Sequence, residues 1–385
     1  MATASAFAQW LTLSRDGAPL SGPREIINGA QKQSYTIFRM INGREKEIMR
    51  WGAKIVEKLK VGGISQTREY VPGSTRQINR VDTSGTLQWD YSPIETAIEW
   101  TEDEIEAHGP DQDQKTAWKN FKFSLEQDGI TDQVNFLESR LWGRPDYTSM
   151  EGSISSTNPR RIYSIPTYCC ERTGTSNLPP GWTGNNIANG QVDNWEEWRN
   201  NVRTYDHTNP FVGNSNLFRA FSGMMLDMQW DGIPGFEQYS TRADLQRLMI
   251  YTNTNGRVIY EDGLKSANDH TRAGPQDPSY GKPVYLGIPI DRAPQLDSAP
   301  LNEVSGSYDS TNPYPDGQPR FFFINANFVY PVFFGKYLLK PSEVMTGGIN
   351  QRDVEAMFWT TKAQLICKSR RKGLGLIRPA SPTAA

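Results

Sequence analysis

The fold is decided by residues 89–105, "WDYSPIETAIEWTEDEI", because the side-chain pattern changes phase within this stretch. Large side chains occupy odd positions before Pro93 and even positions after it: Trp89, Tyr91, Ile94, Ile98 and Trp100. Alternation with a period of two indicates a β-strand with one buried face. Since a shift of one residue moves every side chain to the opposite face, we expect the strand to bend or bulge at Pro93.

The same stretch continues into the start of a helix. Thr101 is followed by Glu104 at the spacing of a capping box, in which a hydroxyl and a carboxylate satisfy the first backbone N–H groups. A long bent strand that runs directly into a helix suits a protein that extends an arm from its body. An enzyme core has no particular use for that arrangement.

A long polar hairpin is expected around this strand. Residues 53–100 alternate weakly, carry many charged, Ser, Thr and Asn side chains, and have a broad tip between Pro72 and Asn79. A two-stranded ribbon this polar is not stable by itself. We therefore expect it to lie on another surface, for which a second subunit is one candidate.

A long amphipathic helix follows the hairpin. Its apolar side chains recur at spacings of three and four: Trp118, Phe121, Leu125, Val134, Leu137 and Leu141. Asp111 or Asp113 can cap its start, and Gly143 can end it. The pattern predicts about eight turns, with a weak point at residues 128–129, "DG".

Shorter elements are expected elsewhere. A short helix is predicted near residues 45–50, and a second amphipathic helix buries Leu217, Phe221, Met225 and Met228. Residues 245–262 are either a hairpin that turns at residues 255–256 or a strand followed by a helix. Strands are predicted at residues 282–290, 320–334 and 355–371.

Composition and charge argue against several classes of function. The chain has 385 residues and a net charge of −2, so electrostatics do not favour a protein that grips nucleic acid or an anionic membrane. Near-neutrality is compatible with a protein that merely encloses nucleic acid. Eleven tryptophans in a chain that is only 37% hydrophobic suit either extensive subunit contacts or a Trp-rich core.

The cysteines and the N-terminal residues bear on where the protein is made. Cys169, Cys170 and Cys367 match neither a disulfide framework nor a zinc spacing, which is typical of a protein made in a reducing cytoplasm. The first residues lack the basic and apolar regions of a signal peptide. No apolar run approaches the roughly 20 residues of a membrane span.

No catalytic, cofactor-binding or metal site is expected from the sequence. His108, His207 and His270 have no Cys or carboxylate at metal-ligand spacing, and the usual hydrolase, metalloprotease and phosphate-loop patterns are absent. Glu95 and Glu99 share one strand face, and a hydrolase could use such a pair. The acids at residues 102–104 are better explained by the dipole of the helix that they open.

A basic cluster near the C-terminus has two interpretations. It comprises Lys368, Arg370, Arg371, Lys372 and Arg378. Four basic residues directly after a strand are more often a solvated end or an ion-pair site between subunits than a contact with DNA. DNA contact is therefore the lesser alternative.

The order of these elements resembles the major capsid proteins of tailed bacteriophages, the Hong Kong 97-like family. The resemblance lies in residues 51–61 ("WGAKIVEKLKV"), 89–110, 189–202 ("NGQVDNWEEWRNNV"), 281–290 ("GKPVYLGIPI"), 322–334 ("FFINANFVYPVFF") and 357–373 ("MFWTTKAQLICKSRRKG"). These stretches are spread over nearly the whole chain, and it is their order that carries the resemblance.

The resemblance implies an α+β fold with an N-terminal arm, an extended β-hairpin loop, a long spine helix, and peripheral and axial domains. The expected boundaries are 1–52 for the arm, 53–100 for the extended loop, 101–165 with 325–385 for the peripheral domain, and 166–324 for the axial domain. The implied function is a non-enzymatic subunit that assembles into pentamers and hexamers of an icosahedral head. That head would enclose double-stranded DNA.

Two departures from the family shape the expected partners. Some relatives crosslink subunits through an extended-loop lysine, but no lysine occurs from Val61 to Gln114, so no crosslink from the hairpin tip is expected. Only residues 1–52 precede the hairpin and Met1 is present, so we expect a separate scaffolding protein and no large N-terminal cleavage. A portal protein is a further expected partner, a decoration protein is left open, and no membrane or cofactor is implied.

Intersubunit contacts are expected at the hairpin tip and at the start of the spine. Basic and aromatic residues of the tip would meet acids of a neighbouring subunit: Arg68, Tyr70, Arg76 and Arg80 against Glu99, Glu102 and Glu104. For each arginine the alternative is a solvated loop charge. Three other functions stay open: an encapsulin-like cargo compartment, a glycoside hydrolase with paired carboxylates, and a trimeric tail or adhesion protein.

Overall fold

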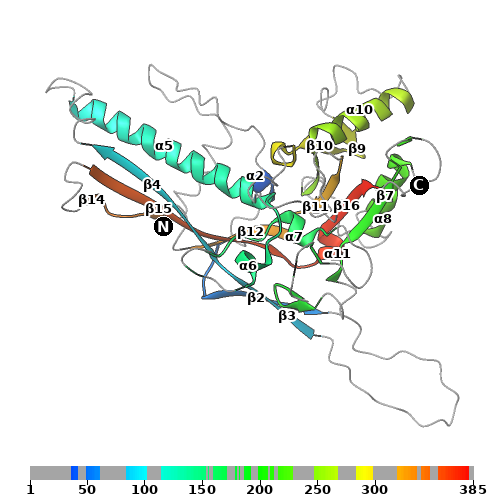
Figure 1. The fold of residues 1–385 in the computed structure, drawn as a ribbon, viewed down its shortest axis with the longest axis horizontal. Coiled ribbons are helices and arrows are strands. Elements are labelled where there is room, and N and C mark those ends of the chain that lie inside the picture. Colours follow the sequence, from blue (N-terminus) through cyan, green and yellow to red (C-terminus); the bar gives the residue numbers. More distant parts are fainter. Residues whose placement is uncertain are drawn as a thin grey trace, which may run out of the picture.

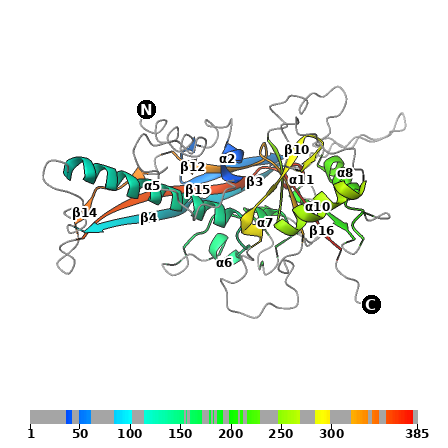
Figure 2. The ribbon, with the colours of Figure 1, turned by 90° about the horizontal axis from the view of Figure 1, so that it is seen from above.

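The computed structural model describes residues 36–41, 49–60, 84–101, 114–152, 155, 159–170, 178–179, 182, 186–191, 198–206, 209–211, 216–228, 247–267, 283–297, 319–335, 340–346 and 354–380. Within these residues the strands form two six-stranded sheets, which lie toward opposite ends of an elongated molecule (Figures 1 and 2). Two short pairs complete the strands: β2 (Lys54–Lys60) with β3 (Ser84–Asp90), and β5 (Asn186–Ile187) with β6 (Gly190–Gln191).

The first sheet is built around the long strand β15 (Val354–Cys367). One edge of β15 pairs antiparallel with the whole of β4 (Ser92–Thr101). The other edge pairs with β12 (Val329–Phe334), β13 (Lys340–Pro341) and β14 (Met345–Thr346), and β1 (Met49–Arg50) adds parallel to β12. Helix α5 (Gln114–Leu141) lies along β4 and β15 (Figure 1).

The predicted phase change is confirmed, although it falls before Pro93. Leu87 and Trp89 are buried in β3, whereas even-numbered residues are buried in β4: Ser92, Ile94, Ile98 and Trp100. β3 pairs with β2 and β4 pairs with β15, so the chain changes partner strand at Tyr91. The predicted hairpin of residues 53–100 is therefore wrong beyond Asp90, because the residues that follow belong to the first sheet.

A buried glutamine stabilises the point where the chain changes partner. The side-chain amide of Gln364, on β15, donates to the Asp90 carbonyl at 2.7 Å. Its carbonyl oxygen accepts the backbone N–H of Tyr163 at 2.8 Å and of Leu365 at 3.0 Å. One side chain thus satisfies polar backbone groups around a break in regular pairing, where they would otherwise be costly to bury.

Helix α5 is continuous through residues 128–129, so the weak point predicted there is wrong. The helix buries three of the predicted apolar residues: Val134, Leu137 and Leu141. A Cβ built at Gly129 would lie 2.7 Å from Cδ1 of Ile98 on β4, so this glycine permits close approach of helix and strand. The residues expected to cap the start of a helix, Asp111, Asp113, Glu102 and Glu104, lie outside the described residues. The side chains of Trp118 and Phe121 also lie outside the described part of the structure.

The second sheet has the strand order β7 (Asn201–Tyr205), β16 (Leu374–Pro379), β11 (Phe321–Asn325), β8 (Leu248–Thr252), β10 (Ile288–Arg292) and β9 (Val284–Tyr285). Helices α8 (Leu217–Asp227) and α10 (Thr254–Ala267) pack against it. The face predicted for α8 is buried: Leu217, Phe221, Met225 and Met228. Short helices occupy connections: α6 (Tyr147–Met150), α7 (Ile165–Tyr168), η4 (Pro294–Leu296) and α11 (Arg370–Gly373).

Several predictions in this half of the chain are decided by the structure. Residues 248–267 are a strand followed by a helix, so the hairpin alternative is wrong, because residues 255–256 lie inside α10. The single strand predicted at residues 282–290 is wrong. It is a hairpin, whose turn residues Leu286 and Gly287 adopt φ angles of 49° and 81°. Residues 320–334 form two strands, β11 and β12, that belong to different sheets.

The helix predicted near residues 45–50 is wrong at its end, where Met49 and Arg50 form a strand, and residues 42–48 lie outside the described residues. Helix α2 spans Thr36–Ile41, and Met49–Arg50 form β1. Met49 and Arg50 pair with Phe333 and Phe334 at the edge of the first sheet. These tertiary hydrogen bonds override a local helical preference that is weak.

Gly129→Leu should destabilise the subunit by about 1–3 kcal/mol, because the new side chain would force β4 away from α5. This loss should appear even though Leu favours helix more than Gly does. Urea unfolding of the unassembled subunit measures it. Asp132→Leu places the same side chain on an exposed position of the same helix, and it should stay within about 0.5 kcal/mol of wild type. Equal stabilities of the two variants would contradict the packing account.

Candidate assembly surfaces

The base of the β2–β3 hairpin is part of the core of its own chain. Ile55 of β2 lies opposite Trp89 of β3, and the two are 2% and 1% exposed. Leu87 of β3 is also fully buried. The expected dependence of the hairpin on another surface is therefore satisfied at its base by this chain, and residues 61–83 lie outside the described residues.

Hydrogen bonds fix this base to the first sheet. Trp89 Nε1 donates to the Tyr168 hydroxyl at 2.7 Å, and that hydroxyl donates to the Leu365 carbonyl of β15 at 2.9 Å. Burial raises the pKa of Tyr168 well above its usual value, so the hydroxyl stays protonated as a donor. Gln88 N–H also donates to the Ala188 carbonyl at 3.0 Å. These hydrogen bonds therefore fix the base of the β2–β3 hairpin, which we call its root, to the rest of the chain.

Ion pairs surround the root of the hairpin. Lys54 and Arg160 lie 3.4 and 3.1 Å from the carboxylate of Asp90. Glu57 pairs with Arg50 at 2.5 Å and lies 3.7 Å from Lys368. These groups are partly exposed, so the pairs orient the root more than they stabilise the fold.

The β4–β15 ribbon has one face covered by α5 and one exposed face. The exposed face of β4 carries a row of alternate residues: Pro93, Glu95, Ala97 and Glu99. Thr360, Phe358 and Ala356 lie opposite the last three of these on β15, and all three are half-buried. We call this surface the outer face; small and apolar side chains at its centre are flanked by the carboxylates of Glu95 and Glu99.

One of the predicted intersubunit residues is placed by the structure. Glu99 lies on the outer face, opposite Ala356. The other predicted contacts lie outside the described residues: Arg68, Tyr70, Arg76, Arg80, Glu102 and Glu104. The structure therefore locates one acid of the predicted contact, Glu99, and the contact itself stays a prediction.

Glu95 and Glu99 are arranged poorly for a paired-carboxylate hydrolase. They lie four positions apart on one extended strand, and both side chains are exposed. At about 3.3 Å per residue their Cα atoms are about 13 Å apart. Glycosidases place their two carboxyl groups roughly 5–9.5 Å apart in a closed site. This pair instead resembles the charged residues that keep an exposed strand soluble.

The basic cluster divides into buried and exposed members. Arg371 and Lys372 are exposed, as predicted for a solvated end. Arg370 contradicts that prediction because it is 0% exposed. Its guanidinium donates to the Tyr168 carbonyl at 2.7 Å and to Asn200 Oδ1 at 2.9 Å, at the point where β15 leads into β16. This arginine is buried at the connection between the two sheets and is not available to a nucleic acid.

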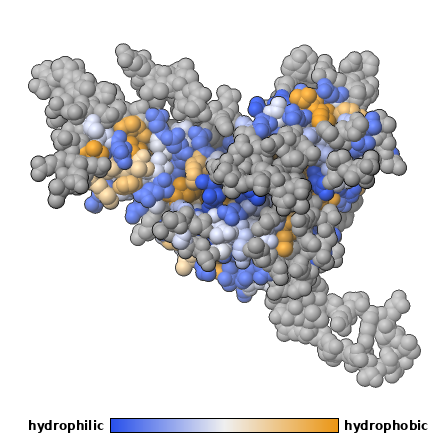
Figure 3. All heavy atoms as spheres, viewed as in Figure 1, coloured by the Kyte–Doolittle hydropathy of each residue, from blue (hydrophilic) through white to orange (hydrophobic). Residues whose placement is uncertain are grey.

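The hydrophobic surface is divided into small areas. Figure 3 shows several separate apolar areas at the ends and in the middle of this face of the molecule, interspersed with hydrophilic residues. The exposed large apolar side chains belong to separate elements and include Leu226, Val258, Leu286, Val344 and Met345. Small dispersed areas suit many weak contacts repeated in an assembly better than one large dimer interface.

Metal and membrane sites find no support in the described part of the chain. Among these residues, no group of three or more His, Cys, Asp or Glu side chains is placed to hold a metal ion. None of the described helices is long and apolar enough to cross a bilayer. The cysteines are buried and form no disulfide bonds.

Trp51 is a surface residue that the sequence pattern did not single out. It is 70% exposed and its ring packs edge-on against Phe334, with ring centroids 5.7 Å apart. Gly52 follows with a φ angle of 124°, a backbone conformation that favours glycine. A "WG" pair at the start of a strand is the only sequence signal that could have indicated it.

Trp89→Ala should destabilise the subunit by about 3–5 kcal/mol, because it empties the base of the hairpin and removes the bond to Tyr168. Trp51→Ala is the matched control, since it removes the same side chain from an exposed position. The control should cost less than about 1 kcal/mol. Chemical unfolding of both variants provides the comparison, and similar losses would show that the hairpin is not rooted as described.

Solved structures similar to this chain include chains from phage structures. A chain of the cyanophage A-1(L) capsid asymmetric unit matches with a TM-score of 0.56 and 12% identity, over 87% of this chain and 90% of that one. A chain from the Mycobacterium phage Ogopogo structure gives a TM-score of 0.49 and 12% identity, over 93% and 97%. No protein-family model and no curated protein matches in sequence. The match to the cyanophage chain shows that this chain has the α+β Hong Kong 97-like fold expected from its sequence.

Proposed function

We propose that the chain is the major capsid protein of a tailed bacteriophage. It would assemble with copies of itself into pentamers and hexamers of an icosahedral head that encloses double-stranded DNA. The observation that carries this proposal is the correspondence of fold with a capsid subunit over 87% of this chain and 90% of the other.

The two sheets support a division into domains. We assign the first sheet and α5 to a peripheral domain, formed by residues 101–165 and 325–385, and the second sheet to an axial domain, residues 166–324. Pairing moves three strands across these boundaries: β1 and β4 pair with β12 and β15 of the first sheet, and β16 pairs with β11 of the second. Residues 1–52 would be the arm, and the extended loop would end at Asp90.

The hairpin and the outer face support a head-to-tail mode of assembly. Each hairpin has a fixed root and would carry its tip residues Arg68, Arg76 and Arg80 away from the body. The outer face of a neighbour presents Glu95 and Glu99. A contact between two different surfaces of identical subunits closes into rings when the rotation between subunits is a simple fraction of a turn.

The remaining partners and the compartment follow from this role. Assembly would take place in the host cytoplasm, with a separate scaffolding protein and a portal, and the finished protein would reside in the virion. A net charge of −2 suits a container that encloses DNA without gripping it. We propose no enzymatic activity for the subunit.

The rival with the same fold is an encapsulin-like shell around a cargo enzyme. The test is to express the chain in a bacterial cytoplasm, treat the lysate with nuclease, sediment it, and image the heavy fraction by electron microscopy. Closed shells, sheets or tubes support a coat protein. Soluble monomers that form no hexamers at high concentration, even with the phage's own scaffolding protein, would contradict it. Particles from infected cells with nuclease-protected DNA favour the phage head, and a packaged enzyme favours the rival.

Arg76→Glu should yield a soluble, folded subunit with at least a tenfold lower yield of particles, because the tip would then repel the acidic outer face. Arg76→Lys keeps the charge and is the matched control. Combining Arg76→Glu with Glu99→Arg should restore part of the yield if these two groups meet. The yield is measured by sedimentation and particle counting. A normal yield from the single variant would refute the contact.

A further inference from the structure

Strand β4 has an edge that faces away from β15. Ala97 of β4 lies opposite Phe358 of β15, whose N–H donates to Ser342 Oγ at 3.0 Å and whose carbonyl accepts the Ser342 N–H at 2.7 Å, away from β4. Opposed residues of an antiparallel pair both face each other or both face away, so the backbone groups of Ala97 face away from β15. Those of Glu95 and Glu99 share this phase. Among the described residues no strand pairs with these groups, which we call the open edge of β4.

Two other residues agree with this phase. The side-chain amide of Gln133, on α5, donates to the carbonyls of Ile94 at 3.5 Å and Trp359 at 3.3 Å. A single nitrogen reaches both only if both carbonyls point into the gap between β4 and β15, so Ile94 has the opposite phase to its neighbours. Pro93 has the phase of the open edge, where the N–H that proline lacks is not needed for pairing with β15.

Strand β2 has an open edge of the same kind. Val56 lies opposite Gln88 of β3, and the Gln88 N–H donates to the Ala188 carbonyl, away from β2, at 3.0 Å. The backbone groups of Val56 therefore face away from β3, and those of Lys54 and Lys58 share this phase. All three side chains are exposed. In the described part of the chain, β2 pairs with β3 alone.

The two open edges carry complementary side chains. On each edge, two like charges four positions apart flank a small or apolar residue: Glu95, Ala97 and Glu99 on β4, and Lys54, Val56 and Lys58 on β2. Pairing an edge with its own copy would place like charges directly opposite each other, which is destabilising. Pairing β2 with β4 places each lysine opposite a glutamate. The charges therefore favour a contact between unlike edges.

We propose that β2 of one copy of this chain adds antiparallel to the open edge of β4 in a second copy. The β2–β3 sheet of one subunit would thereby extend the first sheet of its neighbour, and each pair of opposed edge residues would exchange two backbone hydrogen bonds. The contact joins two different surfaces of identical subunits, so it can repeat around a ring. The register pairs Lys58 with Glu95, Val56 with Ala97, and Lys54 with Glu99.

This contact deepens the proposed function and rests on it, because it requires copies of the chain to associate. It uses the edge of β4, so the outer face above Glu95 and Glu99 stays open to the hairpin tip of a further copy. In strand addition the main-chain bonds supply affinity and the alternating side chains supply specificity. Lys54 also lies 3.4 Å from the Asp90 carboxylate of its own chain, so Lys58 is the better lysine for a test.

A disulfide between copies tests the register in assembled particles of the full-length chain. Val56→Cys combined with Ala97→Cys would place two Cα atoms about 5.5 Å apart, within the range that a disulfide spans. Mild oxidation should link most subunits into covalent oligomers on a non-reducing gel. The native cysteines are buried and should not contribute.

The matched control for this disulfide is Val56→Cys combined with Pro93→Cys. Pro93 is exposed on the same edge but lies four positions from Ala97, about 13 Å along the strand. That distance exceeds the span of a disulfide, so crosslinking should be about tenfold lower.

An exchange of charges tests the pairing without cysteines. Lys58→Glu and Glu95→Lys should each lower the particle yield about tenfold, because each places like charges opposite each other. The two changes together should restore most of the yield. Lys58→Arg keeps the charge and should assemble as the wild type does.

The outcomes separate this contact from the capsid role. Intact particles with no disulfide between positions 56 and 97, or with equal crosslinking in the control, would overturn the contact and leave the capsid role standing. A charge exchange that restores no yield would overturn it even if the cysteine variants fail to fold. If the wild type forms no particles, the capsid role fails. The cysteine pair is then oxidised in concentrated subunits, where a missing disulfide would overturn the contact as well.

Discussion

The structure depends on the change of partner strand at Tyr91. Up to Asp90 the chain pairs with β2 and buries odd-numbered residues; from Ser92 it pairs with β15 and buries even-numbered ones. Gln364 stabilises this point because its side chain bonds the Asp90 carbonyl and the backbone N–H groups of Tyr163 and Leu365. The hairpin is thereby continuous with β4, the strand of the first sheet against which α5 packs.

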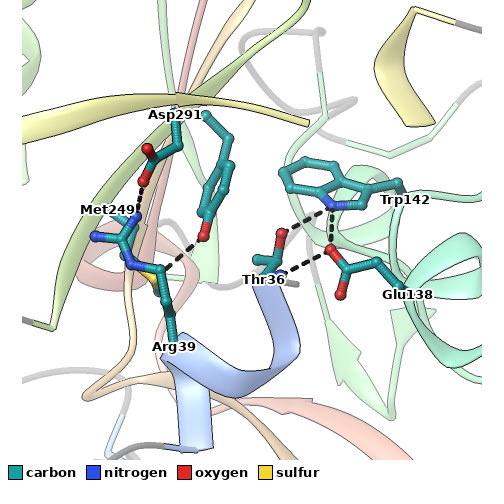
Figure 4. Close-up of polar contacts among 7 residues, drawn as sticks. Thr36, Arg39, Glu138, Trp142, Met249 and Asp291 are labelled. Carbon is teal, nitrogen blue, oxygen red and sulfur yellow. Dashed lines mark hydrogen bonds and ion pairs between the residues drawn. The ribbon is translucent and has the colours of Figure 1, made fainter. Parts of the chain in front are cut away.

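Two further contacts complete the connection between the sheets. Arg370 is buried where β15 leads into β16, and α2 joins Glu138 to Asp291 at the other side. Arg370 donates to carbonyl and amide oxygens within one compact site, so its position is fixed. The α2 contact contains a buried carboxylate that accepts the backbone N–H groups of Thr36 and Ile37 (Figure 4).

The sequence predicted the features that follow from local periodicity. The phase change, the long helix and the apolar face of α8 each repeat over enough residues to be recognised, and they are confirmed. Errors arose where tertiary contacts decide: Met49 pairs with a sheet edge, Leu286 turns a hairpin, and Gly129 packs against Ile98. Of the site, the alternation placed Glu99 on an exposed face, but burial of Glu138 and Arg370 depends on residues far away in the chain.

The measurement that tests the account most directly is an electron cryomicroscopy reconstruction of assembled particles. The account predicts closed shells in which residues 61–83 of each hairpin cross to a neighbouring subunit and lie on its outer face, near Glu95 and Glu99. It also predicts that β2 and β3 stay rooted at Trp89 and Tyr168 of their own chain. Hairpins folded back on their own subunit, or an outer face that touches no neighbour, would contradict the account.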